Sequence, residues 1–96
     1  MVEVRQTPEF EDWLSRLRDI RAKAEVARRV RRLALGNPGD VKPVGEGVSE
    51  LRIPYGPGFR VYFVQRGAVL VILLCGGDKG SQDRDIRRAK ALAEEF

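Results

Sequence analysis

The chain has 96 residues, with 18 Lys and Arg against 14 Asp and Glu, a single Cys and no His. A domain typically contains about 100–200 residues, so this length predicts one domain over residues 1–96. The composition, 43% hydrophobic and 33% charged, is typical of a folded protein. The lack of His excludes His-dependent triads and His-ligated metals, and the lone Cys75 excludes an internal disulfide and a cysteine-based zinc site. We therefore expect no metal and no cofactor.

The formal net charge of +4 favours a polyanionic partner, although many small basic domains bind none. The longest apolar run, Ala68–Cys75, has the length of a strand and is far shorter than the ~20 residues that span a bilayer. The N-terminus carries Glu3 and lacks the apolar segment of a signal peptide. We therefore expect a cytoplasmic protein without membrane contact, and a reduced Cys75 agrees with that compartment.

The N-terminal segment predicts a short strand and a helix. Val2–Gln6 alternates weakly between apolar and polar residues, which indicates an edge strand. Thr7 followed by Pro8 is typical of a helix N-cap and first helical position. An amphipathic helix of about three turns is indicated by apolar residues at helical spacing: Phe10, Trp13, Leu14 and Leu17. The place of Trp13 in this stripe favours a core role over a base-stacking platform.

A second helix is predicted over Ile20–Leu35, ending at Gly36 and followed by a type II turn at Asn37–Asp40. Its apolar face contains Val26, Ala27, Val30, Leu33 and Ala34. The rest of its surface is basic and contains Arg21, Lys23, Arg28, Arg29, Arg31 and Arg32. Such a surface is often simply solvated. The functional alternatives are a protein interface and a nucleic-acid interface, for which Arg28 and Arg32 are the candidates.

From Asp40 onward the hydrophobic period changes from that of a helix to that of a strand. Four strands are predicted, at Val41–Val44, Val48–Ile53, Phe59–Gln65 and Ala68–Cys75. The loop Pro54–Gly58 and a tight hairpin at Arg66–Gly67 join the last three. Because Ala68–Cys75 is apolar throughout, it should be buried on both faces in the sheet interior.

The C-terminal segment predicts a flexible connector, Gly76–Gly80, and a helix that Ser81 caps, with Asp83 and Asp85 in the first turn. The buried face of that helix is expected to contain Ile86, Ala89, Ala93 and Phe96. The predicted class is α+β, a compact antiparallel sheet flanked by helices in the order β-α-α-β-β-β-β-α.

Three cations stand out because strand geometry restricts where they point. Arg52 and Arg60 each lie between apolar residues of a predicted strand, so both face away from their neighbours. If the two strands pair, these arginines meet on one sheet face, with Lys79 at its edge. The simpler interpretation is that each forms a surface ion pair. Like charges directly opposite each other destabilise a sheet, however, and an anionic ligand would relieve that repulsion.

This set suits cleavage of a phosphodiester through the ribose 2′-hydroxyl, which requires a base, an acid and cations for the charge on the phosphorane. Arg52 and Arg60 supply fixed planar charge, and Lys79 is a candidate base or acid. Glu50 is the obvious carboxylate base, or else a partner of Arg52. Tyr62 either contacts nucleic acid, by stacking on a base or orienting a phosphate, or packs in the core.

Four stretches carry a pattern that is specific only in combination: Gly36–Gly45, Val48–Ile53, Gly56–Phe63 and Leu73–Gln82. Together they resemble the phage-derived HigB-type toxins, often described as addiction-module killer proteins, within the RelE/ParE toxin superfamily. The resemblance covers nearly the whole chain. It implies a RelE-like fold and the toxin of a type II toxin–antitoxin pair, a metal-independent endoribonuclease that cleaves mRNA on the ribosome and so inhibits translation. It also implies a cognate HigA-like helix-turn-helix antitoxin.

The resemblance assigns catalysis to Arg52, Arg60 and Lys79, with Lys42 as a secondary candidate for holding RNA. The chain departs from several RelE-like enzymes that carry Tyr or His near the last helix, because it has Arg84, Asp85 and Ile86 there. The general acid and base are therefore not identified, and Asp83 and Asp85 are possible substitutes. The ParE branch shares the fold but inhibits DNA gyrase without being an enzyme, and this is the alternative function.

Overall fold

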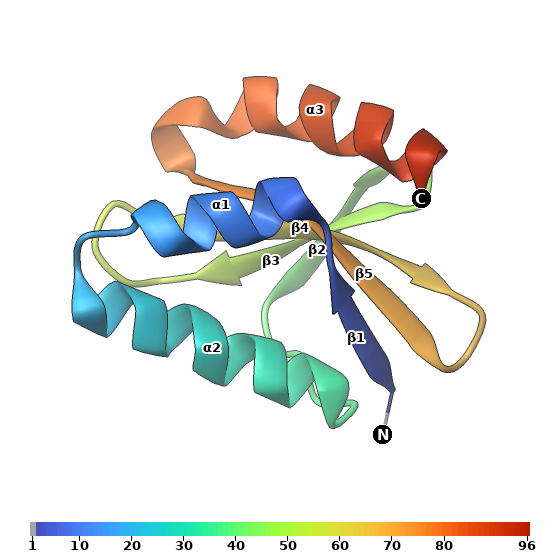
Figure 1. Ribbon diagram of the computed structural model, residues 1–96, viewed down its shortest axis with the longest axis horizontal. Coiled ribbons are helices and arrows are strands. Elements are labelled where there is room, and N and C mark those ends of the chain that lie inside the picture. Colours follow the sequence, from blue (N-terminus) through green and yellow to red (C-terminus); the bar gives the residue numbers. More distant parts are fainter. Residues whose placement is uncertain (1) are drawn as a thin grey trace.

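The computed structural model describes residues 2–96, which contain three α-helices, a short 3-10 helix and a five-stranded sheet (Figure 1). In chain order the elements are β1 (Glu3–Gln6), α1 (Pro8–Arg16), α2 (Ile20–Ala34), β2 (Val41–Gly45), β3 (Val48–Ile53), β4 (Phe59–Arg66), β5 (Leu70–Asp78), η1 (Lys79–Ser81) and α3 (Gln82–Glu95). The predicted α+β class and the order β-α-α-β-β-β-β-α are confirmed.

The strands form one sheet in the order β1-β5-β4-β3-β2. Strands β2 to β5 pair antiparallel with their neighbours, whereas β1, an edge strand as predicted, runs parallel to β5. Helices α1 and α2 cover one face of the sheet and α3 covers the other (Figure 1). The sheet thus divides the interior into two apolar layers.

The layer under α1 and α2 contains the buried side chains of Phe10, Val26, Leu33, Leu51, Ile53, Val61, Phe63, Val71 and Leu73. The layer under α3 contains those of Val48, Tyr62, Val64, Ile72, Leu74, Cys75, Ala89, Leu92 and Ala93. Side chains alternate between the two faces along a strand. Arg52 lies between Leu51 and Ile53, and Arg60 comes directly before Val61. Arg52 and Arg60 therefore face α3.

The start of α1 is fixed by the buried hydroxyl of Thr7. Its Oγ1 accepts a hydrogen bond from the backbone N–H of Phe10 at 3.0 Å and donates one to the carbonyl of Leu74 at 2.6 Å. Trp13, one turn further on, packs against the rings of Phe10 and Phe59, with centroid distances of 5.7 and 6.3 Å. The predicted N-cap and the core role of Trp13 are both confirmed.

A β-bulge interrupts the pairing of β4 with β5. Tyr62 lies opposite Cys75, but the next residue, Phe63, lies opposite Leu73. Leu74 is the extra residue, so Leu74 and Cys75 both face α3. The alternation of β5 is therefore shifted by one residue beyond this point.

The bulge places two glycines under the helices. A Cβ on Gly76 would overlap with the ring of Trp13 on one face, and a Cβ on Gly77 would overlap with the carboxylate of Asp85 on the other. The prediction of a flexible connector at Gly76–Gly80 is wrong, because β5 continues to Asp78 and η1 follows it directly. These glycines are required for close packing of α1 and α3 on the strand, not for flexibility.

The start and end of α3 also differ from expectation. Ser81 occupies the N-cap position without capping the helix, because its hydroxyl donates to the carboxylate of Asp85. The capping side chain is that of Asp78, which accepts from the N–H of Gly80 at 2.8 Å at the start of η1. At the other end Phe96 is 49% exposed, and the buried face is completed by Leu92.

The contact between Gly76 and Trp13 leads to a prediction on stability. Gly76→Ala should lower the free energy of unfolding by about 1–3 kcal/mol, because the new methyl group overlaps with an aromatic ring in the packed layer. Urea unfolding measures the change. Trp13→Leu should be destabilising by itself, yet the double variant should lose less than the sum of the two single losses. Strict additivity would contradict the proposed contact.

Candidate functional site

The three cations predicted from the sequence lie at the same end of the sheet. Arg52 and Arg60 are direct cross-strand partners in the β3–β4 pair. Arg60 in turn lies opposite Gly77 in β5, and Phe59 lies opposite Asp78. Lys79 directly follows Asp78 and is therefore two residues beyond the partner of Arg60. Lys79 is exposed. The prediction that Arg52 and Arg60 share one sheet face, made from the alternation of side chains along a strand, is therefore confirmed.

Arg52 is held at three points. Its Nε lies 3.4 Å from Oδ2 of Asp40, and its backbone N–H donates to the Asp40 carbonyl at 2.9 Å. Its own carbonyl accepts a hydrogen bond of 2.7 Å from Nη1 of Arg29. Asp40 therefore offsets part of the charge of Arg52 and fixes the direction of its side chain.

Arg60 has no such counterion. Within residues 2–96 it forms no ion pair, and its Nε is buried without a hydrogen-bond partner. A buried, unpartnered N–H is unfavourable by roughly 1–3 kcal/mol, and the neighbouring guanidinium of Arg52 adds repulsion. Arg60 is only half-buried as a whole, and an anion bound beside it would offset its charge.

A buried polar network lies next to the arginine pair. Glu50 and Tyr62 are cross-strand partners with no exposed surface. Oε2 of Glu50 accepts hydrogen bonds from the Tyr62 hydroxyl at 3.2 Å and from Nε2 of Gln82 at 2.7 Å, and Oε1 has no partner within residues 2–96. Burial, reinforced by the charge of Glu50, raises the pKa of Tyr62.

This burial corrects two expectations about RNA contact. A ring with no exposed surface cannot stack on a nucleotide base, and a carboxylate with none cannot reach a ribose hydroxyl without rearrangement. The alternative role of Glu50, pairing with Arg52, is also wrong, because Arg52 pairs with Asp40. Glu50 and Tyr62 instead attach the start of α3 to strands β3 and β4 through Gln82.

The remaining titratable candidates lie around the pair Arg52 and Arg60. Lys42 is exposed on the edge strand β2, opposite Glu50. Asp83 is exposed, whereas the carboxylate of Asp85 accepts from the hydroxyl of Ser81 over Gly77 and lies 3.8 Å from Nε of Arg84. No group of three His, Cys, Asp or Glu side chains in the described chain is placed to hold a metal ion.

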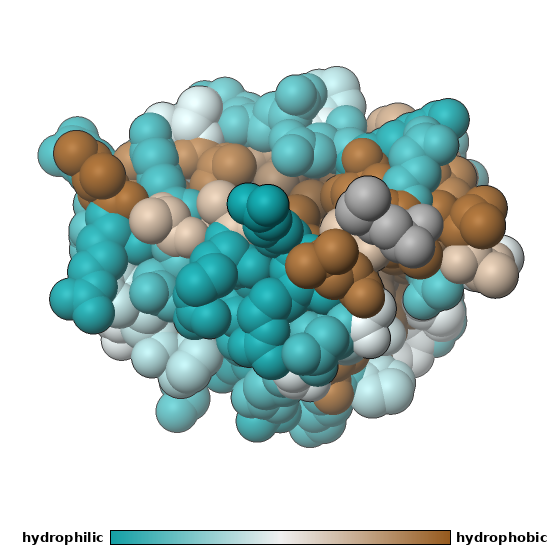
Figure 2. Space-filling model, turned by 90° about the horizontal axis from the view of Figure 1, so that it is seen from below, coloured by the Kyte–Doolittle hydropathy of each residue, from teal (hydrophilic) through white to brown (hydrophobic). Residues whose placement is uncertain are grey.

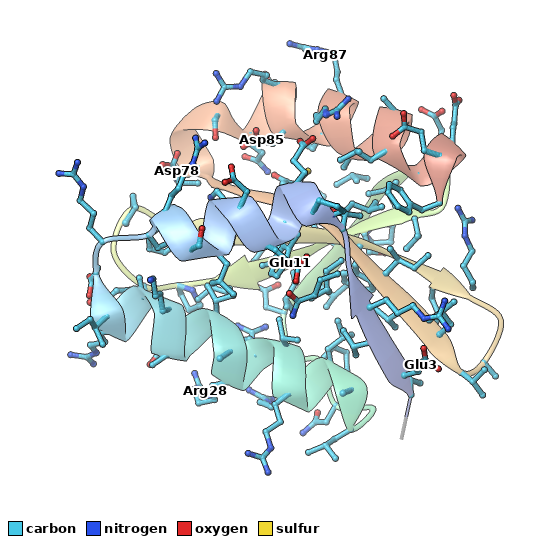
Figure 3. The ribbon with its side chains drawn as sticks, viewed as in Figure 1. Glu3, Glu11, Arg28, Asp78, Asp85 and Arg87 are labelled. Atoms are coloured by element: carbon cyan, nitrogen blue, oxygen red, sulfur yellow. The ribbon has the colours of Figure 1, made fainter. Side chains whose placement is uncertain are left out.

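The basic residues of α2 divide into two groups. Arg29 is only 4% exposed and donates to the carbonyls of Arg52 and Pro38 at 2.7 and 3.0 Å, and burial lowers the pKa of its guanidinium. Its expected place on a solvated surface is therefore wrong. Arg28, in contrast, is exposed on the outer side of the helix and pairs with Glu25 at 2.9 Å (Figure 3). Figure 2 shows a strongly hydrophilic area on this face with apolar residues beside it.

An open hollow of about 510 Å³ lies at the start of α3. It is lined by Lys79, Gly80, Ser81, Gln82, Asp83, Arg84 and Arg87. Sequence reasoning missed Arg84 and Arg87 as site residues. Their spacing of three residues, which places both on one side of a helix, was the available signal.

The two kinds of α2 arginine lead to a matched prediction. Arg29→Gln should lower the free energy of unfolding by about 2–4 kcal/mol, because two carbonyls lose a charged donor in a buried position. Arg28→Gln, one residue away and exposed, should cost at most about 1 kcal/mol. Chemical denaturation of the two variants compares them directly, and equal losses would show that Arg29 is not a structural residue.

Cys75 leads to a prediction on pH. Burial, with a smaller effect from the charge of Asp85, raises the pKa of its thiol to about 12. The unfolded thiol ionises at lower pH, so the unfolded state binds fewer protons than the folded state at alkaline pH. This contribution to stability is complete below about pH 9 and should be lost between pH 9 and 12, by up to about 1.4 kcal/mol per pH unit. Cys75→Ala should flatten that part of the stability profile, and an unchanged profile would contradict the assignment.

The chain has clear relatives. Residues 12–95, which include every strand except β1, match the protein family described as "Phage derived protein Gp49-like (DUF891)". An "Uncharacterized protein" of Haemophilus influenzae (strain ATCC 51907 / DSM 11121 / KW20 / Rd) is 52% identical over 95 residues, which cover 99% of this chain and 96% of that protein. The phage-derived character implied by the sequence resemblance is thereby confirmed, and the chain belongs to the phage-derived Gp49-like family.

Proposed function

We propose that this protein is the toxin of a type II toxin–antitoxin pair and acts as a metal-independent endoribonuclease on mRNA at the ribosome. Membership of the phage-derived Gp49-like family, which is related to toxin–antitoxin modules, supports the first part. The observation that carries the second part is Arg60, a guanidinium without a counterion directly opposite a second guanidinium. This arrangement favours a bound phosphodiester.

In the proposed reaction the ribose 2′-hydroxyl gives up its proton to a base and attacks the adjacent phosphorus. The bond to the 5′-oxygen of the next nucleotide breaks as that oxygen takes a proton from an acid, which leaves a 2′,3′-cyclic phosphate and a free 5′-hydroxyl. Negative charge develops on the non-bridging phosphate oxygens, and fixed guanidinium groups stabilise it more strongly than they stabilise the substrate. Arg60 is the stronger candidate for this contact, because Asp40 already offsets the charge of Arg52. Arg52 would then orient the phosphate from the opposite strand.

Proton transfer must involve groups that RNA can reach. Of the two candidate bases named from the sequence, Lys79 is exposed and Glu50 is fully buried. Lys79 also lies beside the loop that leads into β4, since a Cβ on Gly58 would be 3.6 Å from the Lys79 Cβ. We therefore assign proton transfer to Lys79 and a positioning role to Glu50, which holds Gln82 and Tyr62.

The proposed partners are the ribosome with its mRNA and a cognate HigA-like helix-turn-helix antitoxin. The exposed Arg28, with the half-buried Arg32 that was also named from the sequence, provides one basic surface on α2 for either partner. Arg29 is excluded from that surface because it is buried.

The arginine pair provides the main test of this function. Arg60→Ala should lower the rate of mRNA cleavage on purified ribosomes by a factor on the order of 10², because stabilisation of the phosphorane charge is lost. Arg60→Lys should restore little of it, since an ammonium lacks the planar pair of donors. Arg16→Ala, on α1 and 78% exposed, is the control and should cleave normally. Full activity of Arg60→Ala would place the site elsewhere.

Damage to RNA or to DNA distinguishes the proposed function from the ParE-like alternative. Inducing the protein in cells should produce cleaved transcripts while plasmid supercoiling stays normal. Loss of supercoiling and DNA breaks with intact transcripts would instead identify a gyrase inhibitor.

A further inference from the structure

The hollow at the start of α3 is lined by more cations than carboxylates. Lys79, Arg84 and Arg87 contribute three positive charges to its lining, and Asp83 is the one carboxylate among the seven lining residues. In residues 2–96 neither Lys79 nor Arg87 forms an ion pair, and Arg84 has only the contact of 3.8 Å with Asp85. Figure 3 shows Arg87 pointing away from the sheet into solvent. Lys79 and Arg87 are therefore free to bind an anion from solution, and Arg84 is only loosely paired.

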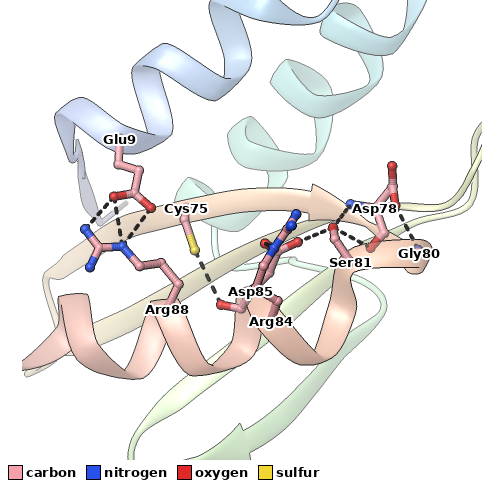
Figure 4. A network of polar contacts seen from close by, with 8 residues as sticks. All are labelled: Glu9, Cys75, Asp78, Gly80, Ser81, Arg84, Asp85 and Arg88. Atoms are coloured by element: carbon pink, nitrogen blue, oxygen red, sulfur yellow. Dashed lines mark hydrogen bonds and ion pairs between the residues drawn. The ribbon is translucent and has the colours of Figure 1, made fainter.

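Two further carboxylates, those of Asp78 and Asp85, lie near the hollow and offset part of this charge, but both accept hydrogen bonds from within the protein (Figure 4). Asp78 accepts from the N–H of Gly80 at 2.8 Å, and Asp85 accepts from the hydroxyl of Ser81. Neither carboxylate lines the hollow. The same bonds hold η1 to the first turn of α3, so the lining backbone is ordered before a ligand binds.

The hollow is connected to the arginine pair by two of its own lining residues. Gln82 lines the hollow and donates to Glu50, which lies two residues before Arg52 on β3. Lys79 also lines the hollow and directly follows β5, two residues after Gly77, the partner of Arg60. A ligand that follows the positive charge from Arg60 past Lys79 therefore enters the hollow.

The arginines of α2 provide a contrast. Arg29 is buried on backbone carbonyls, Arg28 pairs with Glu25 at 2.9 Å, and Arg21 lies 5.3 Å from the centre of the Tyr55 ring. Several of these cations are thus occupied within the protein.

We propose that the hollow binds the phosphodiester backbone of a single RNA strand, one or two nucleotides from the phosphate held by Arg52 and Arg60. This inference rests on the proposed function, because it assumes that the ligand at the arginine pair is RNA. A volume of about 510 Å³ is within the range of sites that take small ligands, and a lining of mainly charged and polar groups suits a phosphate and a sugar rather than a base. Arg84 and Arg87 contact phosphate oxygens and give affinity, not sequence preference.

The test uses the full chain and a single-stranded oligoribonucleotide of about ten nucleotides, with binding followed by fluorescence anisotropy over a salt series. Arg84→Gln combined with Arg87→Gln should weaken binding at least tenfold at low salt. It should also reduce the slope of log K against log salt by about 1.4, as expected when two phosphate contacts to a single strand are lost. In ribosomal cleavage assays the same variant should raise KM and leave kcat nearly unchanged.

Arg16→Gln combined with Arg18→Gln is the matched control, because it removes the same net charge from an exposed surface at the end of α1. An equal loss of RNA affinity in the two double variants would overturn the proposal, because the loss would then depend on the net charge of the protein and not on the hollow. A larger loss for a polyglutamate peptide than for RNA would assign the hollow to an acidic protein partner instead. If the hollow variant binds RNA normally while Arg60→Ala abolishes cleavage, this inference fails and the proposed function stands. If the hollow binds RNA as expected but the wild type cleaves none, the proposed activity fails alone.

Discussion

Strand β5 is the element on which the other layers depend. It pairs with β1 on one side and β4 on the other, and its residues 71–75 are buried on both faces. The carbonyl of Leu74 receives the Thr7 hydroxyl that starts α1, while Gly76 and Gly77 let α1 and α3 approach the strand. The bulge at Leu74 makes this possible, because it gives each glycine the face on which a helix packs. Without the shift, Trp13 and Asp85 would meet different residues.

The candidate site is defined by unequal neutralisation of two neighbouring arginines. Asp40 and Arg29 fix Arg52 from the side of α2, whereas Arg60 has no equivalent partner in residues 2–96. A symmetrical arrangement, with a carboxylate for each guanidinium, would be more stable and would have little affinity for phosphate. The observed arrangement leaves two like charges as cross-strand neighbours, and under the proposed function a bound phosphate would offset them. In this respect the site resembles other charged binding sites, in which part of the stability is given up for function.

Most of the fold could be predicted from the sequence, because hydrophobic periodicity reports directly on which face of an element is buried. That Arg52 and Arg60 share a sheet face followed from the alternation of side chains along a strand, whereas their direct pairing is seen only in the structure. The bulge could not be predicted, since an apolar run such as Leu70–Cys75 has no alternation in which a shift of one residue would be visible. Arg29 could not be distinguished from its neighbours for a related reason. Residue type alone does not show which of six basic residues on one helix is buried. The hollow could not be predicted from the sequence, because Arg84 and Arg87 have the pattern of ordinary surface residues of a helix.

The buried network fixes the position of the start of α3 relative to β3 and β4. Glu50 is enclosed between the sheet and the helix, and it retains hydrogen bonds only while Gln82 and Tyr62 stay in place. Removing those bonds would leave a buried carboxylate without partners, which is strongly unfavourable. The first turn of α3 is therefore held to β3 and β4 by a polar contact that slippage would break, whereas apolar packing at Ala89 and Leu92 would tolerate small shifts. Because Lys79, Arg84 and Arg87 belong to that turn or adjoin it, their distance from Arg60 is fixed by the same contact. Two groups of positive charge with a fixed separation suit a ligand with regularly spaced negative charges, and a nucleic-acid strand has this property.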